Sequence, residues 1–277
     1  MPELPEVELI ARSLDTIVKG RTITGAKLLR QRLAPASTQD EFASDLTNTT
    51  INFVGRRGKH ILIDLSNGKT LIVHLRMSGR FMLLAAERDD PKFTHAVFHF
   101  SSDERLIFDD QRHFGLMKIV ETSRLAEAKE LSKLAPEPFS DEFSLSYFRG
   151  VLAGSGRSLK EFLLDQTKVC GLGNIYACEA MFAAGVDPRI PANTLSAKRA
   201  ERLFESILIV LREAIDHNDG RDIDPENLEG SYFSGGNTTG WLVYDREKEP
   251  CLNCKSPILR LKQGGRSTYY CRRCQRK

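Results

Sequence analysis

Four cysteines near the C-terminus constrain this chain more than any other feature. Cys251, Cys254, Cys271 and Cys274 read C-x2-C-x16-C-x2-C, which is the spacing of a four-thiolate zinc site. A pair of disulfides is the alternative, but the chain has 277 residues and lacks secretory features, which favours metal. The sixteen residues between the pairs fit a β-hairpin. We therefore expect one structural zinc ion that folds a segment too short and too charged to fold alone.

The charge of the chain is concentrated in the same segment. From Cys251 to Lys277 there are eight Lys or Arg and no Asp or Glu, whereas the remainder holds 32 basic and 37 acidic residues. Such a block can be merely solvated. On a metal-folded hairpin it predicts a phosphate-binding surface. Six of the eight cations lie on or beside this hairpin: Lys255, Arg260, Lys262, Arg266, Arg272 and Arg273.

The first half of the chain reads as one helix followed by strands. Residues 4–19 place apolar side chains at helical spacing, with Pro5 in the first turn and Gly20 as the stop. Five strand-like runs follow, several of them separated by turn signals such as SNGK and SSDE. This pattern predicts an antiparallel sandwich or barrel. The runs cover residues 22–29, 50–65, 69–84, 95–102 and 104–120.

The second half changes character after about residue 121. Five segments read as helices: 126–134, 144–152, 158–166, 174–185 and 196–215. PEPFSDE at 136–142 has the composition of a linker. Residues 218–240 are polar and rich in Gly, Asp and Asn, which predicts a functional loop or disorder.

The string LLDQTKVCGLGNIYACEAMF, residues 163–182, joins two of these helices. Glycines at 171 and 173 predict tight turns, and the second helix begins around Asn174. The start of a helix offers free backbone N–H groups to an anion. Asn174 can cap this helix and also reach a phosphate.

Several of these strings together resemble one family. PELPEVE at the terminus, HLRMSGRF, DDQRHFG, VCGLGNIYACEA and the cysteine pattern with GGRST and YYC are similar to formamidopyrimidine-DNA glycosylases. They occur in the family's order and span nearly the whole chain. The resemblance implies base-excision repair of oxidised purines, with strand cleavage at the abasic site.

The resemblance also implies an α+β architecture. We expect an N-terminal β-sandwich domain with a leading helix at 1–125 and a linker at 126–140. A helical domain with a helix–two-turn–helix motif follows at 141–245 and carries a lesion-recognition loop at 218–240. The β-hairpin zinc finger occupies 246–277.

For catalysis, the resemblance points to the amino terminus. If Met1 is removed, Pro2 becomes a secondary amine, and an α-amino group titrates near pH 8 rather than near the 10.4 of lysine. Its free base can attack C1′ of the damaged nucleotide. Glu3 is the expected general acid or base, with Glu6 positioning or relaying protons. Without the resemblance, these carboxylates would be interpreted simply as favourable charges at a helix N-terminus.

Two cations complete the implied catalytic set. Lys59, in GRRGKHILI, matches a catalytic lysine that the family carries on a β-strand. It would bridge a flanking phosphate and the reacting sugar or base. Arg266, in GGRST, matches an arginine that the family uses on DNA phosphate and in the elimination step.

The remaining implied residues contact DNA. Met77 and Phe114 would wedge between bases after the lesion leaves the stack, and Arg112 would hydrogen-bond the orphaned partner base. Met and Phe on apolar strands are ordinarily core residues, but polar turns flank both of these. His60 and His74 read as packing or phosphate contacts rather than metal ligands. The expected DNA contacts outside the wedge are His74, His95, Lys160 and Asn174.

The leading hypothesis is therefore a bifunctional glycosylase and abasic-site lyase for 8-oxoguanine and formamidopyrimidines, acting through β,δ-elimination. We expect a monomer that binds damaged double-stranded DNA, uses no membrane, and resides in the cytoplasm, associated with the nucleoid while acting. One alternative is the endonuclease VIII type, which prefers oxidised pyrimidines; PELPEVE and GKH argue against it. Another is a non-catalytic zinc-finger DNA-binding protein, against which Pro2, Glu3 and Lys59 argue.

Overall fold

The computed structural model describes residues 1–216 and 240–277. It divides into two compact units, and we describe each by itself. The described part of the first unit is Met1–Ser132, and that of the second is 133–216 and 240–277. The predicted recognition loop at 218–240 lies, except for its last residue, outside the described residues.

The first unit begins with α1 (Leu4–Val18), as the periodicity predicts. Glu3 is the extended N-cap residue, and its backbone N–H donates to the Glu6 carboxylate at 2.8 Å. That bond satisfies a donor at the helix start. Gly20 follows the helix with φ 78°, a left-handed conformation that favours glycine. The buried face of α1 comprises Leu4, Pro5, Val7, Ile10, Ala11, Leu14 and Val18.

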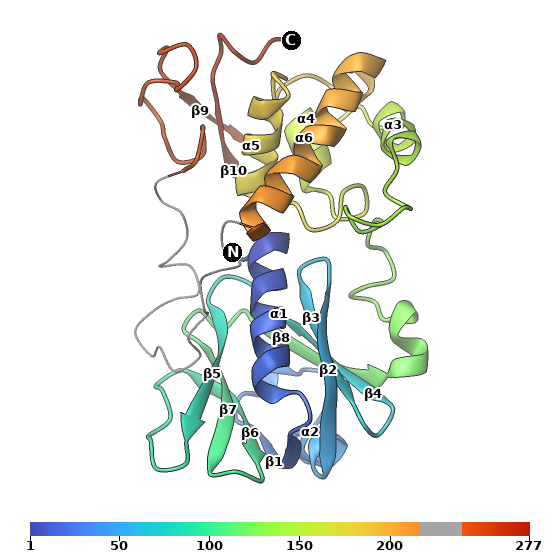
Figure 1. The fold of residues 1–277 in the computed structure, drawn as a ribbon, viewed down its shortest axis with the longest axis vertical. Helices are drawn as coiled ribbons and strands as arrows, with labels where there is room; N and C mark the ends of the chain where they lie inside the picture. Colours follow the sequence, from blue (N-terminus) through green and yellow to red (C-terminus); the bar gives the residue numbers. More distant parts are fainter. Residues whose placement is uncertain (217–239) are drawn as a thin grey trace. The chain divides into compact units, whose positions relative to one another are not determined.

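Eight antiparallel strands form the body of the first unit, in the order β5-β7-β6-β1-β2-β3-β4-β8. β1 and β2 pair only at Thr22–Thr50 and Ile23–Thr49, so the sheet divides there into two four-stranded halves. Figure 1 shows the two halves on either side of α1. The predicted β-sandwich with a leading helix is confirmed. The strands are β1 (Thr22–Leu28), β2 (Thr49–Arg57), β3 (His60–Leu65), β4 (Lys69–His74), β5 (Gly79–Ala85), β6 (Thr94–Phe100), β7 (Glu104–Asp110) and β8 (Leu116–Glu121).

One hydrophobic core holds the halves and helices of this unit together. It contains Ile10 and Leu14 of α1, Phe42 of α2 (Gln39–Leu46), and inward side chains from both halves such as Val73 and Phe108. Burial of apolar area on this scale is the main stabilising term for such a sandwich. The position of the amino terminus is therefore tied to the core through α1.

The structure differs from the sequence-based expectation at two segments of this unit. The helix α2 is additional, and its signal is a capping box in which the Glu41 carboxylate accepts from Thr38 N at 2.7 Å. The helix predicted at 126–134 is wrong. A short 3-10 helix, η2 (Thr122–Glu127), stands at its start and ends where Ala128, with ψ 129°, leaves the helical region; the Ala128 side chain is buried.

The second unit is helical and ends in a hairpin. Its helices lie where the sequence predicts them, and α5 contacts both α6 and the hairpin strand β10. Figure 1 shows the hairpin beside α5. The elements of the second unit are α3 (Leu145–Ala153), α4 (Leu159–Leu164), α5 (Asn174–Ala183), η3 (Ala192–Thr194), α6 (Ala197–Asp216), β9 (Leu259–Gln263) and β10 (Arg266–Tyr270). The first unit also contains a short 3-10 helix, η1 (Gln31–Leu33), between β1 and α2. Within 1–216 and 240–277, no helix is long and apolar enough to cross a bilayer.

Candidate catalytic terminus and nucleic-acid interface

The amino terminus lies in a charged, partly enclosed environment of the first unit. Burial lowers the pKa of the Met1 amine from its usual 8.0; the carboxylates of Glu3 and Glu6 oppose this shift, and Lys59 and Arg112 assist it. Pro2 and Glu3 are both buried. An amine at this place therefore loses its proton more easily than an exposed α-amine, and carboxylates lie near enough to interact with it.

Lys59 reaches this environment from a tight hairpin. It lies in the turn between β2 and β3, not on a strand as the sequence-based interpretation had it, because Gly58 with φ 58° reverses the chain there. Arg56 fixes the turn: its Nε donates to Glu8 of α1 at 2.7 Å, and an NH group donates to the Gly58 carbonyl at 3.1 Å. The same helix that carries the terminus thus holds the turn that carries Lys59.

The three predicted wedge residues lie on two neighbouring turns. Met77 lies between β4 and β5, and Phe114 between β7 and β8; their exposed fractions are 39% and 43%, unusual for large apolar side chains. The Arg112 guanidinium lies 5.4 Å from the Phe114 ring centroid. Both turns belong to the first unit, so the structure brings these three side chains to adjoining sites.

His60 and His74 form a ring contact at the strand ends next to the wedge turns. His60 and His74 open β3 and close β4, with ring centroids 4.7 Å apart and edge-on. Burial lowers the pKa of His60 to about 4 and that of His74 to about 2. His74 Nδ1 accepts from Arg76 N at 3.0 Å, so its proton resides on Nε2.

His95 is placed differently from an exposed DNA contact. It is buried, and its Nε2 lies 2.8 Å from Nδ1 of His113, which follows Arg112 in the wedge turn. In this structure it therefore supports the turn rather than facing solvent.

In the second unit, the helix–two-turn–helix segment differs from expectation in two details. Gly173, not Asn174, is the N-cap residue of α5, and the Asn174 amide donates instead to the Ser267 carbonyl of β10 at 2.9 Å. Lys160 is 0% exposed, and its Nζ donates to the Asn174 carbonyl at 2.8 Å and contacts Cys178 Sγ at 2.9 Å. The lysine and the asparagine lie together, but the ammonium is directed into the protein.

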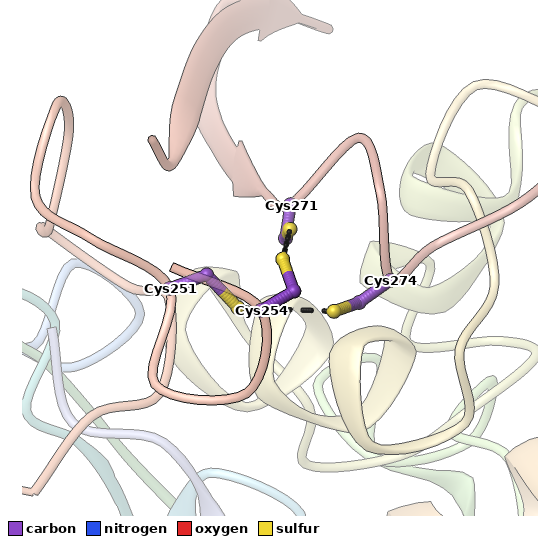
Figure 2. A group of neighbouring side chains, drawn as sticks. All are labelled: Cys251, Cys254, Cys271 and Cys274. Carbon is purple, nitrogen blue, oxygen red and sulfur yellow. Dashed lines mark hydrogen bonds between the residues drawn. The ribbon is translucent and has the colours of Figure 1, made fainter. Parts of the chain in front are cut away.

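The four cysteines of the C-terminal pattern converge in the second unit (Figure 2). Their sulfurs lie within 4.8 Å of one another, and all four are free thiols. Sγ of Cys251 and Cys274 are 3.8 Å apart, and those of Cys254 and Cys271 are 3.4 Å apart. A tetrahedral zinc ion with Zn–S bonds of about 2.3 Å needs sulfurs about 3.8 Å apart. The donor set therefore fits one structural zinc ion, as predicted, and not two disulfides.

The zinc ligands flank the predicted hairpin. β9 and β10 join through Gly264 and Gly265, with φ 54° and 78°, the two left-handed residues that a tight type I′ hairpin requires. Arg266 is exposed as the first residue after this turn. The other cations that the sequence marks on the finger, Lys255, Arg260, Lys262, Arg272 and Arg273, are exposed as well.

Sequence reasoning missed two residues that organise these sites. Glu8 anchors Arg56, but in the sequence it is simply one more acid in the opening helix. Asp110 is 0% exposed, and its carboxylate binds both wedge turns. A buried acid at the end of an apolar strand, in the run IFDD, is the signal that points to it, because such a group needs several hydrogen-bond donors.

A basic hairpin flanked by four zinc-competent cysteines, a helix–two-turn–helix segment and a sandwich with a buried amino terminus are the features of an enzyme that acts on nucleic acid. Three family models match successive segments of the chain. Residues 1–117 match the formamidopyrimidine-DNA glycosylase N-terminal domain, 134–223 its H2TH domain, and 248–276 the zinc finger found in these glycosylases and isoleucyl-tRNA synthetase. The chain belongs to the formamidopyrimidine-DNA glycosylase family, and it is a DNA-repair glycosylase.

Individual relatives agree over the whole length. The glycosylases of Rhodopseudomonas palustris and Bacillus subtilis are each 39% identical, with all of both chains covered. The Lactococcus lactis enzyme, in complex with DNA containing an oxidised pyrimidine, superposes with a TM-score of 0.91 at 31% identity, also over all of both chains. The same enzyme has been determined with abasic-site DNA, at a TM-score of 0.90.

Proposed function

We propose that this protein excises 8-oxoguanine and formamidopyrimidines from duplex DNA and then cleaves the abasic site, using the amine of Pro2 after Met1 is removed. The observation that carries the proposal is the environment of the amino terminus, where burial and cations favour the free amine and carboxylates stand close by. The mechanism follows from what those groups can do.

Excision begins with attack of the Pro2 nitrogen on C1′ of the damaged nucleotide. The glycosidic bond breaks, the base leaves with its electron pair and a proton, and the opened sugar forms an iminium with the proline nitrogen. Glu3 exchanges the protons of this step, and Glu6 positions the amino end through its bond to Glu3 N. Lys59 stabilises the negative charge of the departing base or of a flanking phosphate.

Strand cleavage uses the iminium as an electron sink. A base removes the C2′ proton, and the electron pair expels the 3′ phosphate; loss of the C4′ proton then expels the 5′ phosphate. Arg266 binds phosphate in this step from the tip of the zinc-finger hairpin. Zinc is structural: its four thiolate ligands leave no position for substrate.

Duplex binding needs a filled gap and held phosphates. Met77, Arg112 and Phe114 fill the gap left by the everted nucleotide, and exposure of the two apolar members supports this role. His74 offers its Nε2–H to DNA, Asn174 marks the α5 N-terminus as a phosphate site, and His95 acts through His113. Lys160 contributes to DNA binding by holding the Asn174 backbone, or directly after rearrangement. We place the protein as a monomer on DNA in the cytoplasm, associated with the nucleoid while acting.

Borohydride trapping on an 8-oxoguanine duplex tests the proposal. A reduced covalent adduct is expected, and peptide mass mapping must place the deoxyribose remnant on the N-terminal peptide. Pro2→Gly should lower adduct formation at least tenfold, whereas Pro5→Ala, which alters the other proline of the same helix start, should not.

Other outcomes separate the alternatives. Tight duplex binding without any adduct indicates a non-catalytic binding protein. Faster trapping on thymine glycol than on 8-oxoguanine indicates a pyrimidine enzyme; the Lactococcus lactis complex with an oxidised pyrimidine makes this comparison worth including. An adduct mapped to Lys59 would overturn the role of Pro2.

A further inference from the structure

Asp110 is a buried carboxylate that contacts both turns bearing the proposed wedge. It closes β7 and has 0% exposure. Its Oδ1 accepts from Ser78 Oγ at 2.5 Å and from Arg112 N at 3.2 Å, and its Oδ2 accepts from Gly115 N at 2.7 Å. A buried carboxylate with this many donors is a rigid centre, because removing any donor leaves charge unsolvated.

The donors are the immediate neighbours of the wedge side chains. Ser78 follows Met77, Arg112 is itself a wedge residue, and Gly115 follows Phe114. Ser78 Oγ also accepts from Arg112 N at 3.0 Å. Hydrogen bonds thus join two turns that are more than 30 residues apart in the sequence. One side chain therefore binds the backbone of Arg112 and a residue directly after each of Met77 and Phe114.

The turns need such a support because their backbone is strained. Arg76 and His113 have φ of 56° and 58°, a left-handed conformation that residues with a Cβ rarely adopt. The turns are also closely packed: a Cβ on Gly115 would lie 2.8 Å from the Phe108 ring. Conformations of this kind persist only where the surroundings hold them.

We propose that Asp110 is a positioning residue for lesion eversion, holding the two wedge turns in their inserting geometry before DNA binds. The inference rests on the proposed wedge role of Met77, Arg112 and Phe114. Turns that are ordered before DNA binds lose no further conformational entropy when the wedge inserts. The free-energy barrier to eversion of the damaged nucleotide is therefore lower. The chemistry at the amino terminus is not expected to depend on it in the same way.

Asp110→Asn is the informative substitution, since it keeps size and burial. An amide has only one acceptor atom, so its NH2 group must face either Gly115 N–H or the Arg112 N–H and Ser78 pair. Asp109→Asn is the matched control. Asp109 is the neighbouring buried acid, but its carboxylate binds Arg80 on β5 at 3.1 Å rather than a turn.

The assay compares two substrates of the full-length, zinc-loaded protein. Excision of 8-oxoguanine from a paired duplex requires eversion, whereas cleavage of an abasic site in single-stranded DNA does not. Asp110→Asn should lower kcat/KM for the first about tenfold or more and for the second less than twofold, and Asp109→Asn should leave the ratio of the two unchanged. Equal losses on both substrates, or the same ratio for both variants, would overturn the inference.

A double-mutant cycle separates positioning from general damage. If Asp110 acts through the wedge, Asp110→Asn should have little further effect on paired-duplex excision once Met77→Ala and Arg112→Ala are present. Full additivity would contradict the proposal. If Met77→Ala and Arg112→Ala themselves leave excision unchanged, the wedge assignment fails, and this result is distinguishable from failure of Asp110 alone.

Discussion

Acid should destabilise the first unit through the ring pair of His60 and His74. In the folded protein burial lowers the pKa of His60 from its ordinary 6.5 to about 4; a backbone hydrogen bond at Arg57 and the charge of Glu130 oppose this shift, and the positive charges of Arg76 and Arg57 assist it. The unfolded chain therefore binds a proton on this ring from pH 6.5 downward, while the folded chain does not until about pH 4. The contribution of His60 to the free energy of unfolding is therefore fully present above pH 6.5 and is lost as the pH falls from 6.5 to about 4.

The size of the loss follows from the same shift. Each pKa unit corresponds to about 1.36 kcal/mol, so His60 alone accounts for about 3 kcal/mol by pH 4. The pKa of His74 is lowered to about 2, first by burial and then by the positive charges of His60, Arg76 and Lys59, so His74 adds a comparable amount by pH 4. Against a typical total of about 5–15 kcal/mol, this decides whether the unit stays folded at pH 4.

The assay is urea unfolding of the full-length protein between pH 7 and 4, with histidine NMR titrations to read the two midpoints directly. His60→Phe, which keeps a ring in the contact, should shallow the pH dependence by about 1.4 kcal/mol per pH unit between 6.5 and 4. The buried His95 and the strand residue His99, whose pKa values are also lowered by burial, serve as internal references that the variant retains. A His60 midpoint near 6.5, or an unchanged slope in the variant, would refute the reasoning.

Three further outcomes are expected. Removing zinc with a chelator should unfold the zinc finger and weaken duplex binding. The unfolding midpoint of the first unit, followed by circular dichroism, should not change; simultaneous melting of both units would contradict this prediction. Arg56→Met should lower the borohydride-trapping rate about tenfold by freeing the Lys59 turn, whereas Arg12→Met, which removes a more exposed partner of Glu8 at 2.8 Å, should have little effect. Gly265→Val should cost about 1–2 kcal/mol of finger stability because its φ is 78°, measured as a rise in the zinc concentration needed for DNA binding.

Local patterns in the sequence predict much of this fold for identifiable reasons. Helical spacing and a terminal glycine place α1 to within a residue, and the cysteine spacing predicts the hairpin because metal geometry leaves the intervening chain few alternatives. The segment at 126–134 fails for the opposite reason. Its helical propensity is real, but the chain leaves the helical region at Ala128, with ψ 129°, and Ala128 and Leu131 are buried.

Among the site residues, too, some follow from the sequence and others depend on tertiary packing. The family resemblance singles out Lys59, Met77 and Phe114. Polar turns beside Met77 and Phe114 support exposure of these two, whereas nothing local places Lys59 in a turn rather than on the expected strand. Lys160 is a basic residue in a motif, and a surface phosphate contact is the ordinary expectation. Its burial depends on the Asn174 carbonyl and Cys178, which reach it only after α4 and α5 pack.

Asp110 shows why a support residue is harder to recognise than the group it supports. Its partner Ser78 lies opposite it only because β5 and β7 pair in the register that sets Gly79 against Asp110. A shift of that register by one residue would direct the carboxylate to the other face of the sheet and leave both turns unsupported. The geometry of the wedge is therefore a property of strand pairing as much as of the wedge residues. Substitutions that alter the β5–β7 register should impair eversion even where Met77, Arg112 and Phe114 are intact.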